Sequence, residues 1–122
     1  MQRIIKLKTH TDSRGSLTVL EKVLPFEIKR IYYIYNCSDQ ERGGHRHKKT
    51  IQALICIKGS CIIDWKNSSD GGEGAVLLNE PDTVLLLLPE DYHTMHSFSK
   101  DAVLLVLASE YFDADDYIEE AV

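Results

Sequence analysis

The chain has 122 residues and a formal net charge of −5 at neutral pH. This length provides one core and is too short for two ordinary domains, so residues 1–122 are expected to form a single domain. The acidic balance argues against general nucleic-acid binding, which needs a basic surface. Aliphatic runs such as residues 84–88 are of strand length, and none is long enough to cross a membrane.

The charges are unevenly distributed along the chain. Residues 1–66 hold 13 Lys and Arg against 6 Asp and Glu, whereas residues 67–122 hold one Lys against 13 acids. The basic half can attract a phosphorylated small molecule. The first residues contain no apolar stretch of signal-peptide length, and the three cysteines, Cys37, Cys56 and Cys61, fit reduced thiols. A cytoplasmic protein is therefore expected.

Strand-like segments account for most of the N-terminal half. They are residues 4–8, 16–23, 26–36, 51–57 and 61–65. A turn is predicted at residues 11–15, and the last two segments flank Gly59 as the clearest hairpin. In the third segment, alternation puts Tyr33 and Tyr35 on one face and Tyr32 on the other.

The C-terminal half adds short strands after a polar loop at residues 67–74. They are residues 75–78, 84–88, 94–98 and 103–108. Only residues 113–122 suit a helical turn, and their acids suit a solvated end equally well. Short strands without a convincing amphipathic helix predict an all-β antiparallel barrel or sandwich. Residues 103–107 are apolar on both faces, which predicts that a second copy covers one face in a homodimer.

Two histidines one residue apart, His45 and His47, follow Arg42-Gly43-Gly44. Side chains alternate along a strand, so both imidazoles lie on one face. Four residues separate His47 from Gln52, and six separate Gln52 from Gly59. This is the spacing of the first cupin motif, with Gln in place of the usual carboxylate. Such a pair predicts metal ligands or proton-transfer groups at the mouth of a small barrel.

The glutamine at position 52 favours proton transfer over metal binding. A carboxylate would offer a divalent cation an anionic oxygen, whereas an amide offers only a neutral carbonyl. We therefore expect neither a metal nor another cofactor. The alternative is a metal-dependent cupin enzyme with His45, His47 and His93 as ligands. His93 and His96 fall on opposite faces of a regular strand, and His93 is the one expected to reach the cavity.

Matching residues run through most of the chain in the order of a known family. They are Arg14-Gly15-x-Leu17, Pro25-Phe26-x-Ile28-Lys29-Arg30, Tyr32-Tyr33, Arg42-Gly43-x-His45-x-His47-Lys48, residues 103–109 and Asp116-Tyr117-Ile118. On these residues the chain resembles the cupin-fold sugar-nucleotide 3,4-ketoisomerases of deoxysugar biosynthesis, a route that includes lipopolysaccharide O-antigen sugars. Arg46 departs from the family, which usually has a small residue between the histidines.

The resemblance implies an all-β cupin of the RmlC-like type, an antiparallel β-barrel or jelly roll. It implies an isomerase that moves the carbonyl of dTDP-4-oxo-6-deoxy-glucose from C4 to C3, and a homodimer that works without a metal. Two other functions stay possible. A 3,5-epimerase of the same sugar nucleotides would exchange the C5 hydrogen with solvent, and a sugar-binding module would bind the nucleotide sugar without turnover.

Carbonyl migration needs proton removal at C3 and proton delivery to C4 through an enediol, both general acid–base steps. Imidazole titrates near neutral pH, so His45 and His47 are the expected catalytic groups, with His47 preferred as the base. Tyr33, matched by the resemblance, is the expected donor to the enediolate oxygen. The expected substrate-binding residues are Arg14, Lys29, Arg30, Tyr35, Arg42, Gln52 and His93, and the arginines suit a diphosphate.

Overall fold

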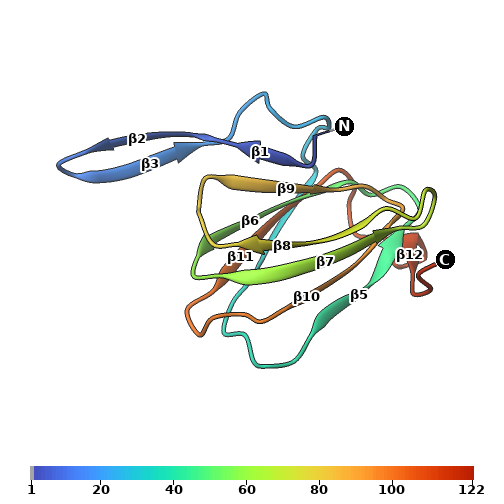
Figure 1. Cartoon of the computed structure of the whole chain (residues 1–122). Helices are drawn as coiled ribbons and strands as arrows, with labels where there is room; N and C mark the ends of the chain where they lie inside the picture. Colours follow the sequence, from blue (N-terminus) through green and yellow to red (C-terminus); the bar gives the residue numbers. More distant parts are fainter. Residues whose placement is uncertain (1) are drawn as a thin grey trace.

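The computed structural model describes residues 2–122, which form two packed five-stranded antiparallel sheets and a separate two-stranded hairpin (Figure 1). The first sheet contains, in spatial order, β1 (Ile4–Lys6), β9 (Thr83–Leu87), β6 (Gln52–Lys58), β11 (Val103–Ala108) and β4 (Arg30–Ile34). The second contains β12 (Tyr117–Ile118), β5 (Arg42–His47), β10 (Asp91–His96), β7 (Cys61–Asn67) and β8 (Glu73–Leu78). The hairpin is β2 (Lys8–Asp12) and β3 (Gly15–Val19).

The predicted all-β antiparallel class is confirmed. One 3-10 turn, η1 (Ala114–Asp116), is the only helical element of the described residues. Among residues 2–122, no helix is long and apolar enough to cross a membrane. The largest difference from the predicted strands concerns residues 26–36, of which only β4 is a strand. The residues before it pack as an irregular segment over the first sheet.

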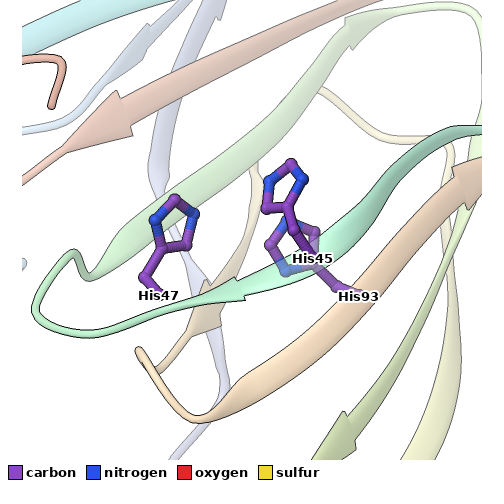
Figure 2. A group of neighbouring side chains, drawn as sticks. All are labelled: His45, His47 and His93. Atoms are coloured by element: carbon purple, nitrogen blue, oxygen red, sulfur yellow. The ribbon is translucent and has the colours of Figure 1, made fainter. Parts of the chain in front are cut away.

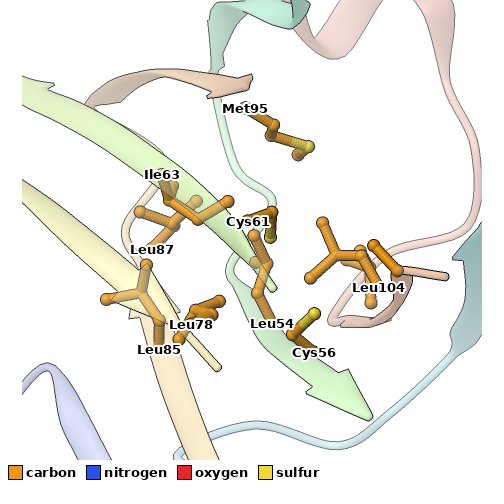
Figure 3. Packing of buried hydrophobic residues seen from close by; sticks show 11 residues of the cluster. Leu54, Cys56, Cys61, Ile63, Leu78, Leu85, Leu87, Met95 and Leu104 are labelled. Atoms are coloured by element: carbon orange, nitrogen blue, oxygen red, sulfur yellow. The ribbon is translucent and has the colours of Figure 1, made fainter. Parts of the chain in front are cut away.

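Apolar side chains from both sheets meet in the main core (Figure 3). Leu54 and Leu104 of the first sheet lie against a cluster that includes Ile63 and Leu78 of the second, and all four are fully buried. Burying one such side chain contributes about 1.5–3 kcal/mol, so this layer holds the sheets together. Cys56 and Cys61 lie in the same cluster as free thiols and act as small core residues.

The outer face of the first sheet carries a second apolar cluster. Ala53, Ile55 and Leu107 are covered there by the segment before β4, through residues such as Leu24 and Phe26. The apolar character of residues 103–107 on both faces is thus partly explained within one chain. The homodimer expected from that pattern stays a prediction.

The hairpin β2–β3 projects away from both sheets (Figure 1). Every residue of β2 is exposed, and Leu17 of β3 is 59% exposed. The predicted turn at residues 11–15 is confirmed at its tip, where the Asp12 carboxylate accepts hydrogen bonds from the amide and guanidinium of Arg14. An isolated two-stranded hairpin is marginally stable in water at best. This hairpin, with its exposed side chains, has little packing to stabilise it.

Candidate active site

Three histidines meet where β5 and β10 lie side by side. His45 of β5 is the register partner of His93 of β10, and His47 follows on the same face of β5. Figure 2 shows the three imidazole rings close together. One nitrogen from each ring lies within 4.8 Å of the others, and the ring centroids of His45 are 5.2 Å from His47 and 4.9 Å from His93. The expectation that the pair shares one face is confirmed.

A β-bulge brings the two strands together at this point. The register between β10 and β5 shifts between His93 and Thr94, whose partners are His45 and Gly43. Gly43 has φ of +84°, and a Cβ at this position would lie 2.9 Å from the carbonyl oxygen of His93. Glycine is therefore required both by the backbone conformation and by the close approach of β10.

A buried carboxylate orients His47. The Asp116 Oδ2 atom lies 2.8 Å from His47 Nδ1, and Asp116 also accepts hydrogen bonds from the Thr50 hydroxyl and the amides of Lys48 and Lys49. Burial opposes ionisation of Asp116, but the hydrogen bonds outweigh it and lower its pKa. His47 Nδ1 therefore donates to a carboxylate, and its Nε2 keeps a free lone pair.

The backbone orients His93. Its Nδ1 lies 3.0 Å from the carbonyl oxygen of Asp91, so Nδ1 donates and Nε2 again keeps the lone pair. The Asp91 side chain is itself fully buried, where it accepts from the Arg3 guanidinium, the Asn67 amide and the Leu88 backbone. The Nε2 atoms of His47 and His93 are buried and have no hydrogen-bond partner among residues 2–122. Buried polar atoms seldom lack partners, so these two suggest a ligand.

Burial keeps all three imidazoles neutral. It lowers the pKa of His45 to about 4, helped by neighbouring His47, and lowers the pKa of His93 to about 4 as well. Burial also lowers the pKa of His47, although the hydrogen bond to Asp116 opposes that effect. At neutral pH the cluster consequently offers proton acceptors, with the best-supported imidazolium at His47.

A pocket of about 300 Å³ opens beside the cluster. His45 lines it together with Arg30, Tyr32, Arg42 and Tyr117, while His47 and His93 lie behind. The guanidinium of Arg30 lies over the Tyr32 ring, 4.6 Å from its centroid. Two guanidinium groups beside neutral imidazoles form a site for an anionic substrate that undergoes proton transfer.

Gln52 lies behind this pocket as a buried residue. Its amide nitrogen donates to the Tyr32 hydroxyl at 3.0 Å, and its oxygen has no partner among the described residues. Arg46, between the histidines, points elsewhere and donates to the carbonyl oxygen of Glu120.

Three expected site residues, Tyr35, Lys29 and Arg14, do not line the pocket beside His45, whereas Tyr33 stands at its rim. Tyr33 and Tyr35 are 62% and 58% exposed, with ring centroids 5.9 Å apart, and they lie on the outer side of β4, opposite the half-buried Tyr32. Tyr33 nevertheless lines the rim of the pocket that His45 lines, so its expected role stays a prediction. Lys29 Nζ lies 6.0 Å from the centroid of the Tyr111 ring, and Arg14 is at the hairpin tip.

The site contains three residues for which the sequence predicted no role: Tyr32, Asp116 and Tyr117. The alternation along β4 was predicted correctly, but it does not say which face turns inward. Asp116 and Tyr117 come after an irregular segment that follows β11, and the strand β12 is only two residues long. They were among the residues matched to the family, and that match was the available signal.

The same three histidines also fit a metal ion in number and spacing. Neutral imidazole nitrogens within 4.8 Å of one another suit a divalent transition metal, which His45, His47 and His93 would hold. Gln52, whose amide nitrogen is turned toward Tyr32, adds no anionic ligand.

Comparison with known proteins identifies close relatives. Residues 1–122 match the family model described as FdtA, WxcM-like, C-terminal. The chain is 43% identical over 121 residues to a TDP-4-oxo-6-deoxy-alpha-D-glucose-3,4-oxoisomerase of Aneurinibacillus thermoaerophilus, covering 97% of this chain and 86% of that protein.

Solved structures agree with this likeness. The chain is similar to a 3,4-ketoisomerase from Helicobacter canadensis, with a TM-score of 0.90 and 40% identity over 97% of this chain and 90% of that one. A variant of the 3,4-ketoisomerase QdtA from Thermoanaerobacterium thermosaccharolyticum, in complex with TDP-4-keto-6-deoxyglucose, gives a TM-score of 0.89 at 43% sequence identity. The match covers 96% of this chain and 86% of that one. The rmlC epimerase of Mycobacterium tuberculosis gives a TM-score of 0.78 at 16% sequence identity, covering 93% of this chain and 66% of that one. This likeness concerns the fold alone, and it confirms the RmlC-like cupin fold.

Proposed function

The chain belongs to the FdtA family (WxcM-like, C-terminal), and from this premise we propose that it moves the carbonyl of TDP-4-oxo-6-deoxy-glucose from C4 to C3. It is an isomerase of the TDP-sugar 3,4-ketoisomerase type. The observation that carries the mechanism is the cluster of His45, His47 and His93, neutral and partly unpartnered, beside a pocket with two arginines.

The reaction needs no oxidant or reductant. A base takes the proton from C3 while the oxygen on C4 is protonated, which gives the 3,4-enediol. C4 then receives a proton and the oxygen on C3 loses one, which leaves the carbonyl at C3. Proton transfer by a positioned side chain typically contributes about 10²–10⁴-fold in rate.

His45 and His47 divide this work in the proposal. His45 lines the pocket and is placed to contact the sugar. His47 is backed by Asp116, which stabilises its imidazolium, so His47 is the group that best holds the proton between the two steps. The two rings are close enough for small side-chain shifts to bring either one to the substrate.

Arg30 and Arg42 are the proposed diphosphate ligands. Both line the pocket from the strands β4 and β5 that border it. A guanidinium binds phosphate oxygens in pairs, which suits a TDP-sugar better than a single ammonium does. His93 and Gln52 complete the proposed site from behind the pocket, and Lys29 stays a prediction at its edge.

Incubation with TDP-4-oxo-6-deoxy-glucose in D₂O, followed by NMR, tests the function. We expect a 3-oxo product with deuterium confined to C4, because C3 then carries the carbonyl and holds no hydrogen. Deuterium at C5 would indicate a 3,5-epimerase, and binding without any product would indicate a sugar-binding module. Either result would contradict the proposal.

A metal-dependent enzyme is the second candidate, favoured by the spacing of the three histidines. Metal analysis and chelation separate the two readings. We expect full activity after EDTA treatment, and inhibition by added Zn²⁺, because the ion would occupy the imidazole lone pairs. Loss of activity on chelation, restored by a metal, would favour the second candidate.

The proposal includes a homodimer in which the hairpin β2–β3 of one chain adds to the free edge of β4 in another. β4 is an edge strand, and its exposed Ile31, Tyr33 and Tyr35 form an apolar face that a second copy would cover. An unpaired edge readily accepts an added strand. Because β4 borders the pocket, this arrangement would bring Arg14 of one chain toward the partner's pocket.

Mixing two impaired variants tests the shared site. Chains carrying Arg14→Ala are combined with chains carrying His47→Asn, at a substrate concentration where both are slow. Each mixed dimer would contain one intact site, so about a quarter of the wild-type activity is expected from random pairing. If Arg14 served its own chain, mixing would restore nothing.

Two further expectations belong to the same proposal. The match over residues 1–122 supports a single cupin domain. The three free cysteines favour a reducing compartment, the cytoplasm.

A further inference from the structure

We infer that Tyr117 is a further catalytic residue, whose hydroxyl carries the proton exchanged between the oxygens on C4 and C3 of the sugar. This inference rests on the proposed ketoisomerase function and extends it. It concerns the two oxygen atoms, because an imidazole that takes the proton from C3 or delivers one to C4 cannot serve a sugar oxygen in the same step.

The chain places Tyr117 directly against the histidines. It lies in β12, where its register partner is His47 of β5. Its ring centroid is 4.8 Å from that of His45 and 4.6 Å from that of His47. The preceding residue, Asp116, holds His47 Nδ1, so two consecutive residues contact the same imidazole.

The hydroxyl of Tyr117 is available, unlike that of the other inward-facing tyrosine. Tyr117 lines the pocket together with Arg30, Tyr32 and His45. The Tyr32 hydroxyl accepts a hydrogen bond from Gln52, and its pKa is raised by burial and by the nearby Tyr117. Within residues 2–122, the Tyr117 hydroxyl has no hydrogen bond to another side chain or to the backbone. An unengaged phenol in a pocket beside two bases is free to bond to a substrate oxygen.

The proton balance shows what a phenol contributes. When the histidine takes the C3 proton, Tyr117 gives its proton to the oxygen on C4, which forms the enediol. When the histidine returns its proton to C4, the hydroxyl on C3 gives its proton to the Tyr117 phenolate as the new carbonyl forms. Both protein groups end the cycle as they began it, and no co-reactant is consumed.

The substitution Tyr117→Phe tests this role because it removes the hydroxyl and keeps the ring that packs on the histidines. We expect kcat to fall about 10²–10³-fold, the loss typical for one donor to a developing oxyanion. KM should stay within about threefold, because the interaction strengthens mainly in the transition state. Tyr111→Phe, a change to a 73% exposed tyrosine just before η1, is the matched control and should keep the wild-type kcat.

Three measurements accompany the kinetics: the melting temperature, the affinity for TDP, and the wild-type activity on TDP-4-oxo-6-deoxy-glucose. A fall in kcat of tenfold or more, with fold and TDP affinity retained, supports the inference. A smaller fall overturns it, and so does a fall that accompanies loss of the fold, since the hydroxyl would then be structural. An inactive wild-type protein would instead contradict the proposed function itself.

Discussion

The histidine pocket and the projecting hairpin β2–β3 represent opposite ways of holding a functional side chain. In the pocket, His47 and His93 are each fixed by a hydrogen bond at Nδ1, and the groups that fix them are buried in turn. In the hairpin, Arg14 pairs with the nearby Asp12, and Leu17 is left exposed. One chain therefore positions the histidines by itself, whereas it leaves the side chains of the hairpin exposed.

This difference separates two kinds of expected defect. Substitutions in the pocket should lower kcat, because they remove groups that act on the reacting atoms. Substitutions in the hairpin should raise KM or weaken assembly, because they remove contacts made equally in the ground and transition states. The predictions below, from the largest effect to the smallest, each test one side of this comparison.

His47→Asn should cause the largest loss. It removes the imidazole backed by Asp116 while keeping a polar side chain of similar size, and we expect kcat to fall by about 10³-fold or more. Steady-state kinetics with the TDP-sugar checks this. His96→Asn is the control, since His96 lies farther along β10 and contacts Asp64 instead. Full activity in both His45→Asn and His47→Asn would mean that this pair does not transfer the proton.

Asp116→Asn should lower kcat by about 10²-fold, because a neutral amide stabilises the His47 imidazolium less than a carboxylate does. Asp116 also accepts bonds from Thr50, Lys48 and Lys49, so the melting temperature should fall as well. Asp115→Asn, next to it but exposed, is the control for both measurements. An unchanged rate would show that His47 works without its carboxylate partner.

Arg14→Ala should raise KM about tenfold, equivalent to about 1.4 kcal/mol, with little change in kcat. The proposed reason is the loss of one diphosphate contact, which the hairpin would supply to the pocket of a second chain. Lys8→Ala, also on the hairpin and exposed, is the control. A kcat defect as large as that of His47→Asn would break the proposed division between pocket and hairpin.

Acid should lower the stability of the folded chain through the buried histidines of the pocket. His93 has a pKa of about 4 in the folded chain and an ordinary value of 6.5, so between these values the unfolded chain binds the extra proton. Stability is therefore fully present above pH 6.5 and is lost as pH falls toward 4. Melting temperatures measured across this range should decline, and the decline should be shallower in His93→Gln.

Much of the fold was predictable because strand periodicity and turn composition are local. The hairpin around Gly59, the turn carrying Arg14 and the shared face of His45 and His47 all follow from side-chain alternation and backbone preference. Residues 26–36 show the limit of such reasoning. An apolar segment such as the one around Phe26 looks like a strand whether it pairs with neighbours or packs across a sheet.

By itself, the sequence determined the cupin class, the motif from His45 to Gly59 and the family resemblance, because these depend on residue identity and spacing along the chain. Only the tertiary structure decided which face of β4 turns inward, which puts Tyr32 on the half-buried side and Tyr33 at the pocket rim, and that Asp116 and Tyr117 return to His47. The physical reason is that nearly 70 residues separate His47 from its carboxylate partner. Contacts at that separation arise from the packing of whole sheets, which no local pattern encodes.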